Sequence, residues 1–211
     1  DLLPKEERLE RIYTLGILAN GYANILKKEE AMKTINQLIN EFGKSENEVE
    51  QMYINFYKSS IFALWGDPKE ALESGFKARD YSIKLKIKVV EIAATFSIGR
   101  TYLAMNDIEN SAKYMRQAIE LAKSYQLLIG MMSLFFFFAE TLAMLGKTKE
   151  AYDVFEEGKK YAGMMNPIFY AQWQNRTQII IGLNAHDADQ DHLLELNKKA
   201  LECLKQLGDL Y

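Results

Sequence analysis

The sequence is poor in the residues that cross-link or interrupt a chain. Its 211 residues include one cysteine, Cys203, three prolines and 12 glycines. A lone cysteine cannot form a disulfide within the chain, so nothing points to an oxidising compartment and we expect a cytoplasmic protein. We interpret Cys203 as a small packing residue, because no partner that would activate its thiol is visible. With so few breakers and many good helix formers, long helices are favoured.

An excess of charge of one sign is also lacking. The formal net charge is −3, and acidic and basic residues are interspersed. A nucleic-acid surface needs a basic excess, so we expect no direct nucleic-acid binding. The chain opens on Asp1 with charged residues close behind, which predicts no signal peptide, and the lack of an initiating methionine indicates a fragment of a longer protein.

No long apolar run is uninterrupted. The longest, around 127–145, contains Ser133, Glu140 and Thr141, and it therefore predicts a buried helix and no membrane span. Within it, four consecutive aromatic residues, Phe135 to Phe138, would point nearly all round a helix. We expect that helix to be covered on most sides.

Catalytic and metal-binding motifs are missing as well. The sequence has no Gly-rich phosphate loop, no Ser/His/Asp arrangement and no Cys/His cluster. The nearest candidate is the acidic segment 186–192, but a calcium loop there would need glycine and glutamate where His192 and Lys198 stand. We interpret it as a helix start at which Asp189 or Asp191 meets the helix N-terminus. We expect no catalytic residues, no metal and no cofactor, and hence no enzyme.

What the sequence does contain is an internal repeat of 40 residues. Small residues recur without a gap at one position, and again at a second position twelve residues earlier. The first set is Ala31, Ala71, Ser111 and Ala151, and the second is Ala19, Ser59, Gly99 and Ala139. Large residues recur three places after the second set, at Tyr22, Phe62, Tyr102 and Leu142. Two helices of a hairpin approach closely where small residues meet, and a bulky neighbour fills the groove beside them.

Local signals place helix ends to match. Asp67 can serve as an N-cap, Pro68 fits the first turn of a helix, and the Glu70 side chain can accept from the backbone N–H of the N-cap residue. Ser45 with Glu48 predicts another capping box. We predict helix pairs over 5–26 and 28–42, 46–65 and 68–84, 87–105 and 108–124, 127–145 and 148–162, and 167–184 and 189–207.

Two stretches resemble the signature of the tetratricopeptide repeat (TPR): Ile98-Gly99-x-x-Tyr102, and Phe138-Ala139-x-x-Leu142 followed by Ala151-x-x-x-Phe155. The resemblance implies an all-α, right-handed solenoid of about five antiparallel helix pairs. We divide it into four repeats over 1–165 and a divergent terminal pair over 166–211, continuous with them. The 40-residue period is similar to the sensor regions of bacterial regulators, of the maltose-regulator and peptide-pheromone types.

In this family the first helix of each pair lines the concave face, so the resemblance also implies a binding stripe. Its candidate residues are Asn20, Tyr53, Phe56, Ser60, Phe96, Arg100, Phe136 and Glu140. In one interpretation the aromatic residues anchor a ligand and Arg100 pairs with a ligand carboxylate. In the other, the phenylalanines pack between repeats and Arg100 pairs with Glu140 as an ordinary ion pair.

Three functions follow as hypotheses. The first is a non-catalytic module that recognises a peptide or protein segment in the concave groove. The second is the ligand- or pheromone-sensing region of a bacterial transcriptional regulator. The third is a structural dimerisation scaffold that uses the last helix pair. The expected partner is a protein or peptide, or a second copy in a homodimer, and neither a nucleic acid nor a membrane.

Overall fold

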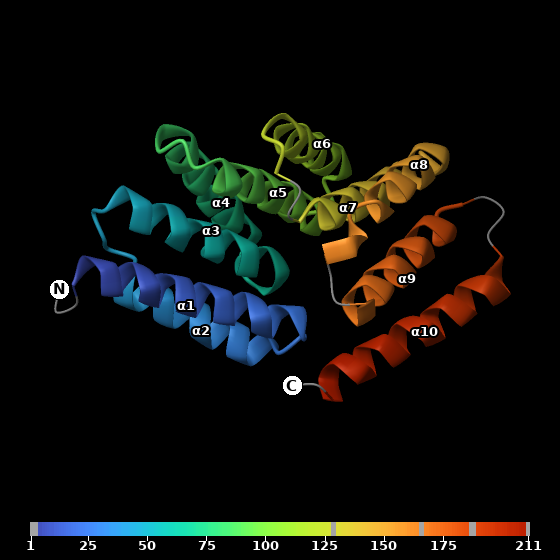
Figure 1. Ribbon diagram of the computed structural model, residues 1–211, viewed down its shortest axis with the longest axis horizontal. Helices are drawn as coiled ribbons and strands as arrows, with labels where there is room; N and C mark the ends of the chain where they lie inside the picture. The colour runs from blue at the N-terminus through green and yellow to red at the C-terminus, as the bar shows by residue number, and fades with distance from the viewer. Residues whose placement is uncertain (1–3, 128–129, 165–166, 186–188, 210–211) are drawn as a thin grey trace. The chain divides into compact units, whose positions relative to one another are not determined.

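The computed structural model describes residues 4–127, 130–164, 167–185 and 189–209, and in these residues the chain forms helices and no strand. The helices divide into two compact units, Asp1–Asp107 (unit 1) and Ile108–Tyr211 (unit 2) (Figure 1). Unit 1 holds α1 (Lys5–Asn24), α2 (Lys28–Phe42), α3 (Glu48–Trp65), α4 (Pro68–Lys84) and α5 (Lys88–Ala104). Unit 2 holds α6 (Ile108–Ser124), α7 (Met131–Met144), α8 (Thr148–Lys159), a short 3-10 helix (Ala162–Met164), α9 (Pro167–Leu183) and α10 (Gln190–Asp209).

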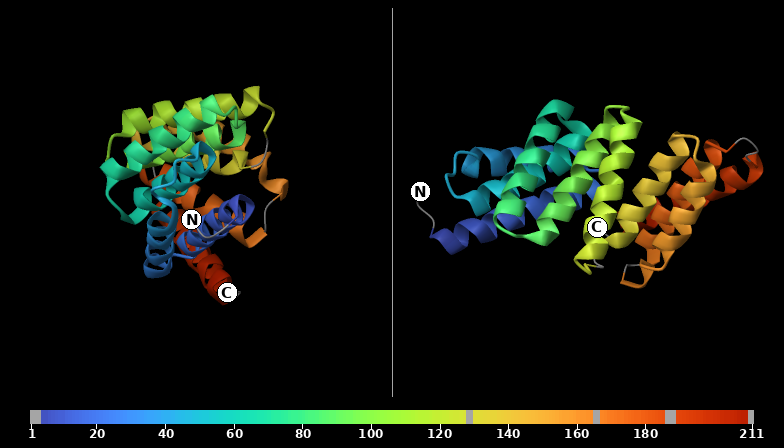
Figure 2. Two further views of the ribbon diagram at one scale, coloured as in Figure 1. Left: turned by 90° about the vertical axis from the view of Figure 1, so that its left-hand side faces the viewer. Right: turned by 90° about the horizontal axis from the view of Figure 1, so that it is seen from above.

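Within each unit, consecutive helices pack on one another and neighbouring first helices are in contact. In unit 1, α3 packs on α1, α2 and α4, and α5 packs on α3 and α4. In unit 2, α7 packs on α6, α8 and α9, and α9 packs on α10. Figure 2 shows the helices of each unit lying side by side. The prediction of an all-α fold built from helix pairs is confirmed, whereas the predicted division near residue 165 stays a prediction.

The small residues of the repeat share one environment. The four second helices α2, α4, α6 and α8 begin at Lys28, Pro68, Ile108 and Thr148, each forty residues after the last. Every one of the eight small residues is buried, namely Ala31, Ala71, Ser111, Ala151, Ala19, Ser59, Gly99 and Ala139. Burial of a small residue is what the close approach of two packed helices requires.

Three hairpin turns end the first helix in the same way, whereas the α3–α4 turn does not, since Gly66 has φ of −99°. Leu26, Asn106 and Gly146 follow α1, α5 and α7 with φ of 60°, 59° and 73°. The next residue then donates its N–H to a carbonyl in the last helical turn, as Lys27 N does to Tyr22 O at 2.9 Å and Lys147 N does to Leu142 O at 3.0 Å. This left-handed ending satisfies carbonyls that the helix leaves without partners.

Helix starts agree with the sequence at one predicted cap and differ at another. The Asp67 carboxylate accepts from the N–H groups of Lys69 and Glu70 at 2.7 and 3.2 Å, as predicted. The capping box predicted from Ser45 and Glu48 is wrong, because Asn47 caps α3 and its side chain accepts from two N–H groups of the first turn. The Ser45 hydroxyl instead donates to the carboxylate of Glu50 at 2.6 Å.

The four consecutive phenylalanines form the centre of the core of unit 2. Phe135 to Phe138 are all buried, with at most 6% of any side chain exposed. Phe135 stacks on Tyr161 with ring centroids 5.4 Å apart, and Phe137 meets Trp173 edge-on at 5.0 Å. The prediction that this helix is covered on most sides is confirmed. α7 begins at Met131, after Gly130 with φ of 79°, which is later than the predicted start at 127.

Candidate binding face

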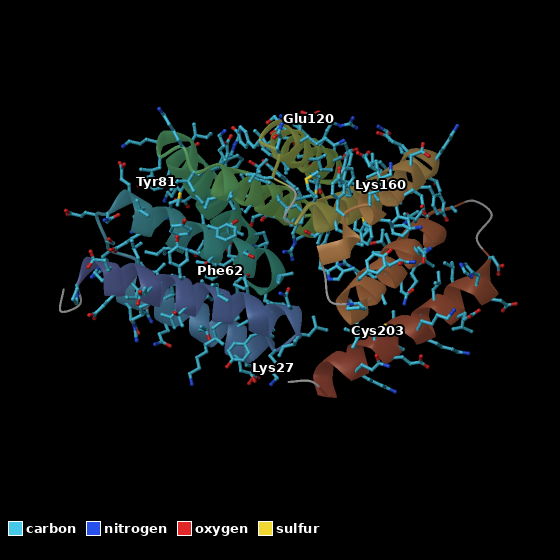
Figure 3. All side chains as sticks on the ribbon, viewed as in Figure 1. Lys27, Phe62, Tyr81, Glu120, Lys160 and Cys203 are labelled. Atoms are coloured by element: carbon cyan, nitrogen blue, oxygen red, sulfur yellow. The ribbon has the colours of Figure 1, made fainter. Side chains whose placement is uncertain are left out.

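Six of the eight predicted site residues lie on consecutive first helices of unit 1. Helix α3 packs on both α1 and α5, so the three first helices lie side by side. Asn20 is on α1, Tyr53, Phe56 and Ser60 are on α3, and Phe96 and Arg100 are on α5. All six side chains are half-buried. We call these six residues the unit 1 face. Figure 3 draws all described side chains as sticks on the helices.

The polar part of the unit 1 face is held together by a direct hydrogen bond. The hydroxyl of Ser60 donates to the side-chain carbonyl of Asn20 at 3.0 Å. The two residues occupy equivalent positions forty residues apart, so the bond joins neighbouring first helices. It orients an amide and a hydroxyl at a half-buried place, where each retains further hydrogen-bonding capacity.

Tyr13 lies against Tyr53 of the unit 1 face, and the neighbouring Tyr57 is buried. The rings of Tyr13 and Tyr53 are tilted against each other with centroids 4.4 Å apart. Burial, together with the neighbouring hydroxyl of Tyr53, raises the pKa of Tyr13 above its usual range. Burial also raises the pKa of Tyr57 to about 12, with a smaller contribution from Tyr53. Tyr13 and Tyr57 are therefore neutral at physiological pH, so neither adds a charge to this part of unit 1.

The α5 part of the unit 1 face combines an aromatic ring and a cation. The Arg100 guanidinium lies 5.9 Å from the centroid of the Phe96 ring. One repeat earlier, Phe56 is tilted against Tyr57 with ring centroids 5.1 Å apart. A guanidinium at the edge of cation–π range above a half-exposed ring is a combination that is common where proteins bind other proteins.

The two remaining predicted residues lie in unit 2, and both are fully buried. Phe136 packs on Phe155 with ring centroids 4.9 Å apart. Glu140 accepts hydrogen bonds from Arg176 and Thr177 of α9, both at 2.8 Å. These side chains join α7 to its neighbours in the core. The predicted pairing of Arg100 with Glu140 stays a prediction, since the two residues belong to different units.

Sequence reasoning missed Arg176. Its guanidinium lies 4.8 Å from the Phe137 ring and 5.4 Å from the Trp173 ring, and it forms an ion pair with Glu140 at 2.8 Å. Arg176 follows Glu140 by thirty-six residues, so a search at the repeat spacing does not connect them. Burial of a charged carboxylate is tolerated because both of its oxygens are hydrogen-bonded.

The structure also bears on the acidic segment 186–192 and on the predicted absence of a membrane span. Asp189 caps α10, because its carboxylate accepts from the N–H of His192 at 3.1 Å, as predicted. Residues 186–188 of the acidic segment lie outside the described residues, and the described residues contain no group of three or more His, Cys, Asp or Glu side chains placed to hold a metal. None of the helices in the described ranges has the length and apolar character needed to cross a membrane.

Comparison with known proteins agrees with this geometry. Residues 93–125, which contain most of α5 and all of α6, match the tetratricopeptide repeat family. The chain is similar in structure to the nearly identical TPR-like repeats of a candidate kinesin light chain from Podosopora anserina, with a TM-score of 0.58 and 13% identity, over 93% of this chain and 96% of that one. A single-substitution variant of those repeats aligns with a TM-score of 0.57 and 13% identity, over 94% and 97% of the two chains. No curated protein matches the sequence.

One segment of the chain therefore matches the tetratricopeptide repeat family, and the chain has the fold of TPR-like repeat proteins. Helix-pair repeats of this kind commonly serve as surfaces for protein interaction and are typically non-catalytic scaffolds. At 13% identity, the neighbours are evidence for the fold alone.

Proposed function

We propose that this chain is a non-catalytic binding module whose unit 1 face recognises an extended segment of a peptide or protein. The observation that carries the proposal is the gathering of half-exposed aromatic and polar side chains on three neighbouring first helices of one unit. The two predicted residues of unit 2, Phe136 and Glu140, are buried, so we assign them to the core of that unit and not to the binding face.

The chemistry of the face favours a peptide. Tyr53, Phe56 and Phe96 offer apolar area with few rotatable bonds, which lowers the entropy lost on binding. Asn20 and Ser60 supply a donor and acceptor pair suited to a peptide backbone. Arg100 supplies the cation, and in a half-buried setting a charge-assisted hydrogen bond to a carboxylate is stronger than one in open water.

A peptide selection tests the proposal directly. A displayed library of random peptides is panned on the whole chain, and selected peptides are titrated by calorimetry into wild type, Phe96→Ala and Arg100→Ala. We expect each substitution to weaken binding about tenfold or more, or about 1.4 kcal/mol, because anchors at the centre of an interface carry most of its energy.

Lys77→Ala is the matched control. Lys77 lies on α4, is 55% exposed and pairs with Glu73, so its removal takes one cation from the surface away from the first helices. Circular dichroism verifies that all variants are folded. Equal affinity of the selected peptides for wild type, Phe96→Ala and Arg100→Ala would rule out the unit 1 face as the binding site.

The two other functions predicted from the sequence, a sensory region and a scaffold for dimerisation through the last pair, stay predictions. Neither is favoured over peptide recognition by the described contacts of the first helices.

A further inference from the structure

The turn between α4 and α5 exposes aliphatic side chains at the ends of two helices of unit 1 (Figure 1). Ile83, in the last turn of α4, is 48% exposed, and Val89, in the first turn of α5, is 61% exposed. Helix α4 packs on both α3 and α5, so these side chains are exposed although their helices have neighbours.

Lysines alternate with the aliphatic residues along this turn. Between Asp80 and Glu91 the charged residues are Lys84, Lys86 and Lys88, and all three are exposed. No other ten consecutive residues of the sequence contain three cations and no acid. The turn therefore concentrates positive charge in a chain whose formal net charge is −3.

The repeat does not require this charge. Lys86 and Lys88 follow Glu46 and Glu48 by forty residues, so the same positions carry the opposite charge one repeat earlier. Both turns connect a second helix to the next first helix. The lysines are thus a property of this one turn, and the helix-pair fold is compatible with either sign of charge.

The backbone of the turn is satisfied from within. The N–H of Leu85 donates to Tyr81 O at 2.8 Å, and the N–H of Ile87 donates to Ser82 O at 2.8 Å. Lys86 lies at the tip with φ of 57°. Because these backbone donors are already used, the tip can enter a medium poor in water at low cost. It offers little to the backbone of an extended peptide, which binds through such groups.

Several other charged side chains lie near the turn. They are Arg79 and Asp80 of α4, Glu48 of α3, Glu91 of α5, and Lys44 and Glu46 between α2 and α3. Glu48 forms an ion pair with Lys84, and Lys44 and Glu46 offset each other. With those two set aside, four cations (Arg79 and the three lysines) face three acids, so the local charge stays positive.

The acids also lie behind the tip. Asp80 precedes Lys86 by six residues and Glu91 follows it by five. At a rise of about 1.5 Å per residue, these carboxylates lie ~7–9 Å back along their helices. The attraction between a charge and an anionic surface falls off within about 8 Å at physiological salt. A surface that touches the tip therefore meets the lysines first.

We propose that the α4–α5 turn binds the surface of a membrane that contains anionic phospholipids. Ile83 and Val89 enter the headgroup region, and the three lysines lie against the lipid phosphates and carboxylates. A lipid surface accepts exposed aliphatic and basic side chains together without a matching groove, whereas a helical peptide needs one.

This proposal is separate from peptide binding by the unit 1 face. It also departs from the expectation that no membrane is a partner. That expectation rested on the absence of an apolar run long enough to span a bilayer, and contact with the membrane surface needs no such run.

Binding to lipid vesicles tests the proposal. The whole chain is sedimented with vesicles of phosphatidylcholine alone, and with vesicles of equal parts phosphatidylcholine and phosphatidylserine. We expect at least tenfold tighter binding to the anionic vesicles, which weakens as salt is added. Lys86→Asn combined with Lys88→Gln should lose about thirtyfold, since each lysine near an anionic surface contributes about fivefold. Asparagine is chosen at Lys86 because it tolerates left-handed backbone.

A second pair of substitutions tests the aliphatic contribution. Ile83→Ser combined with Val89→Ser leaves the charge unchanged and should weaken binding to the anionic vesicles about tenfold, because less apolar area enters the headgroup region. Both positions are exposed, so we expect the fold to be kept, and circular dichroism verifies this.

The matched control removes two lysines from elsewhere on α4. Lys69→Gln combined with Lys77→Gln lowers the net charge by the same amount at exposed positions, and should leave vesicle binding unchanged. Equal binding to the two kinds of vesicle overturns the proposal, as does a turn variant that binds the anionic vesicles as tightly as the control. Binding of a soluble peptide rich in glutamate and leucine, with no binding to vesicles, would overturn it in favour of an acidic protein segment.

Discussion

At the scale of single residues, the turn between α1 and α2 places left-handed backbone on a side chain that disfavours it. Leu26 has φ of 60°, and its side chain is 67% exposed, so little burial compensates for the strain. Gly146 occupies the same position three repeats later, with φ of 73°. A residue with a Cβ in this conformation loses about 1 kcal/mol relative to glycine.

Leu26→Gly should therefore stabilise the protein by about 0.5–1 kcal/mol, because glycine relieves the strain and gives up part of that gain to the entropy of the unfolded chain. Gly146→Ala is the matched opposite and should destabilise it by about 1 kcal/mol. Urea unfolding followed by circular dichroism measures both. A loss of stability in Leu26→Gly would mean that the leucine side chain contributes packing that outweighs its backbone strain.

At the scale of elements, a buried ion pair joins α1 to α3. Glu50 is 2% exposed and accepts from Arg8 at 2.8 and 3.1 Å, and from Ser45 at 2.6 Å. The Arg8 guanidinium also lies 5.2 Å from the Phe42 ring of α2. The carboxylate of Glu50 raises the pKa of Arg8 further above its usual range, so the pair stays charged. The contacts of Arg8 thus join three helices of unit 1.

Arg8→Met should cost about 3 kcal/mol, because it leaves the Glu50 carboxylate buried without its counter-charge. The double variant Arg8→Met with Glu50→Leu should recover part of that loss, since both charges are then removed. Chemical unfolding of wild type, both single variants and the double variant gives the coupling energy. Additive single losses would show that the two side chains act independently.

Arg11→Met is the control on the same helix. Arg11 binds Glu41 of α2 at 2.6 and 2.9 Å, but both side chains are substantially exposed, so we expect a cost of no more than about 1 kcal/mol. Hydrogen bonds from Arg11 and Gln37 lower the pKa of Glu41 from 4.5 to about 2. This small contribution is present above pH 4.5 and is lost as the pH falls towards 2.

At the scale of the whole molecule, each unit has its own tight helix contact. In unit 2, a Cβ on Gly158 would lie 2.6 Å from the Cβ of Phe135. In unit 1, a Cβ on Gly75 would lie 2.8 Å from Ile98 and 2.9 Å from the hydroxyl of Ser59. Contacts this short force the helices apart, and in a repeat protein such damage acts mainly on neighbouring elements.

Gly158→Ala should lower stability by about 2 kcal/mol, because the added methyl group overpacks the α7–α8 contact. Amide hydrogen exchange should accelerate in α7, α8 and α9 more than in α1 to α3. Gly75→Ala, the matched variant, should accelerate exchange chiefly in α3, α4 and α5. Uniform acceleration along the chain in either variant would instead indicate that the chain unfolds as one cooperative body.

The helices could be predicted because their determinants are local. An N-cap such as Asp67 and a recurring small residue such as Ala71 act within one turn or one hairpin, so their spacing along the chain is sufficient evidence. Prediction failed by a few residues where two local signals compete. At α3, Ser45 and Asn47 can both cap a helix. Asn47 forms the cap, because the Ser45 hydroxyl donates its hydrogen bond to the carboxylate of Glu50 in the first turn of α3.

The sequence alone was sufficient to predict which residues lie on the same side of their helices. A period of 3.6 residues places Asn20, Ser60, Phe96 and Phe136 on comparable sides. Whether each side chain is reachable did not follow. Phe136 and Glu140 are buried by α8 and α9, whereas Phe96 stays half-exposed and Ile17 is 63% exposed. The exposure of a side chain depends on residues that are distant in the sequence and pack against it, and only the tertiary structure determines which residues those are.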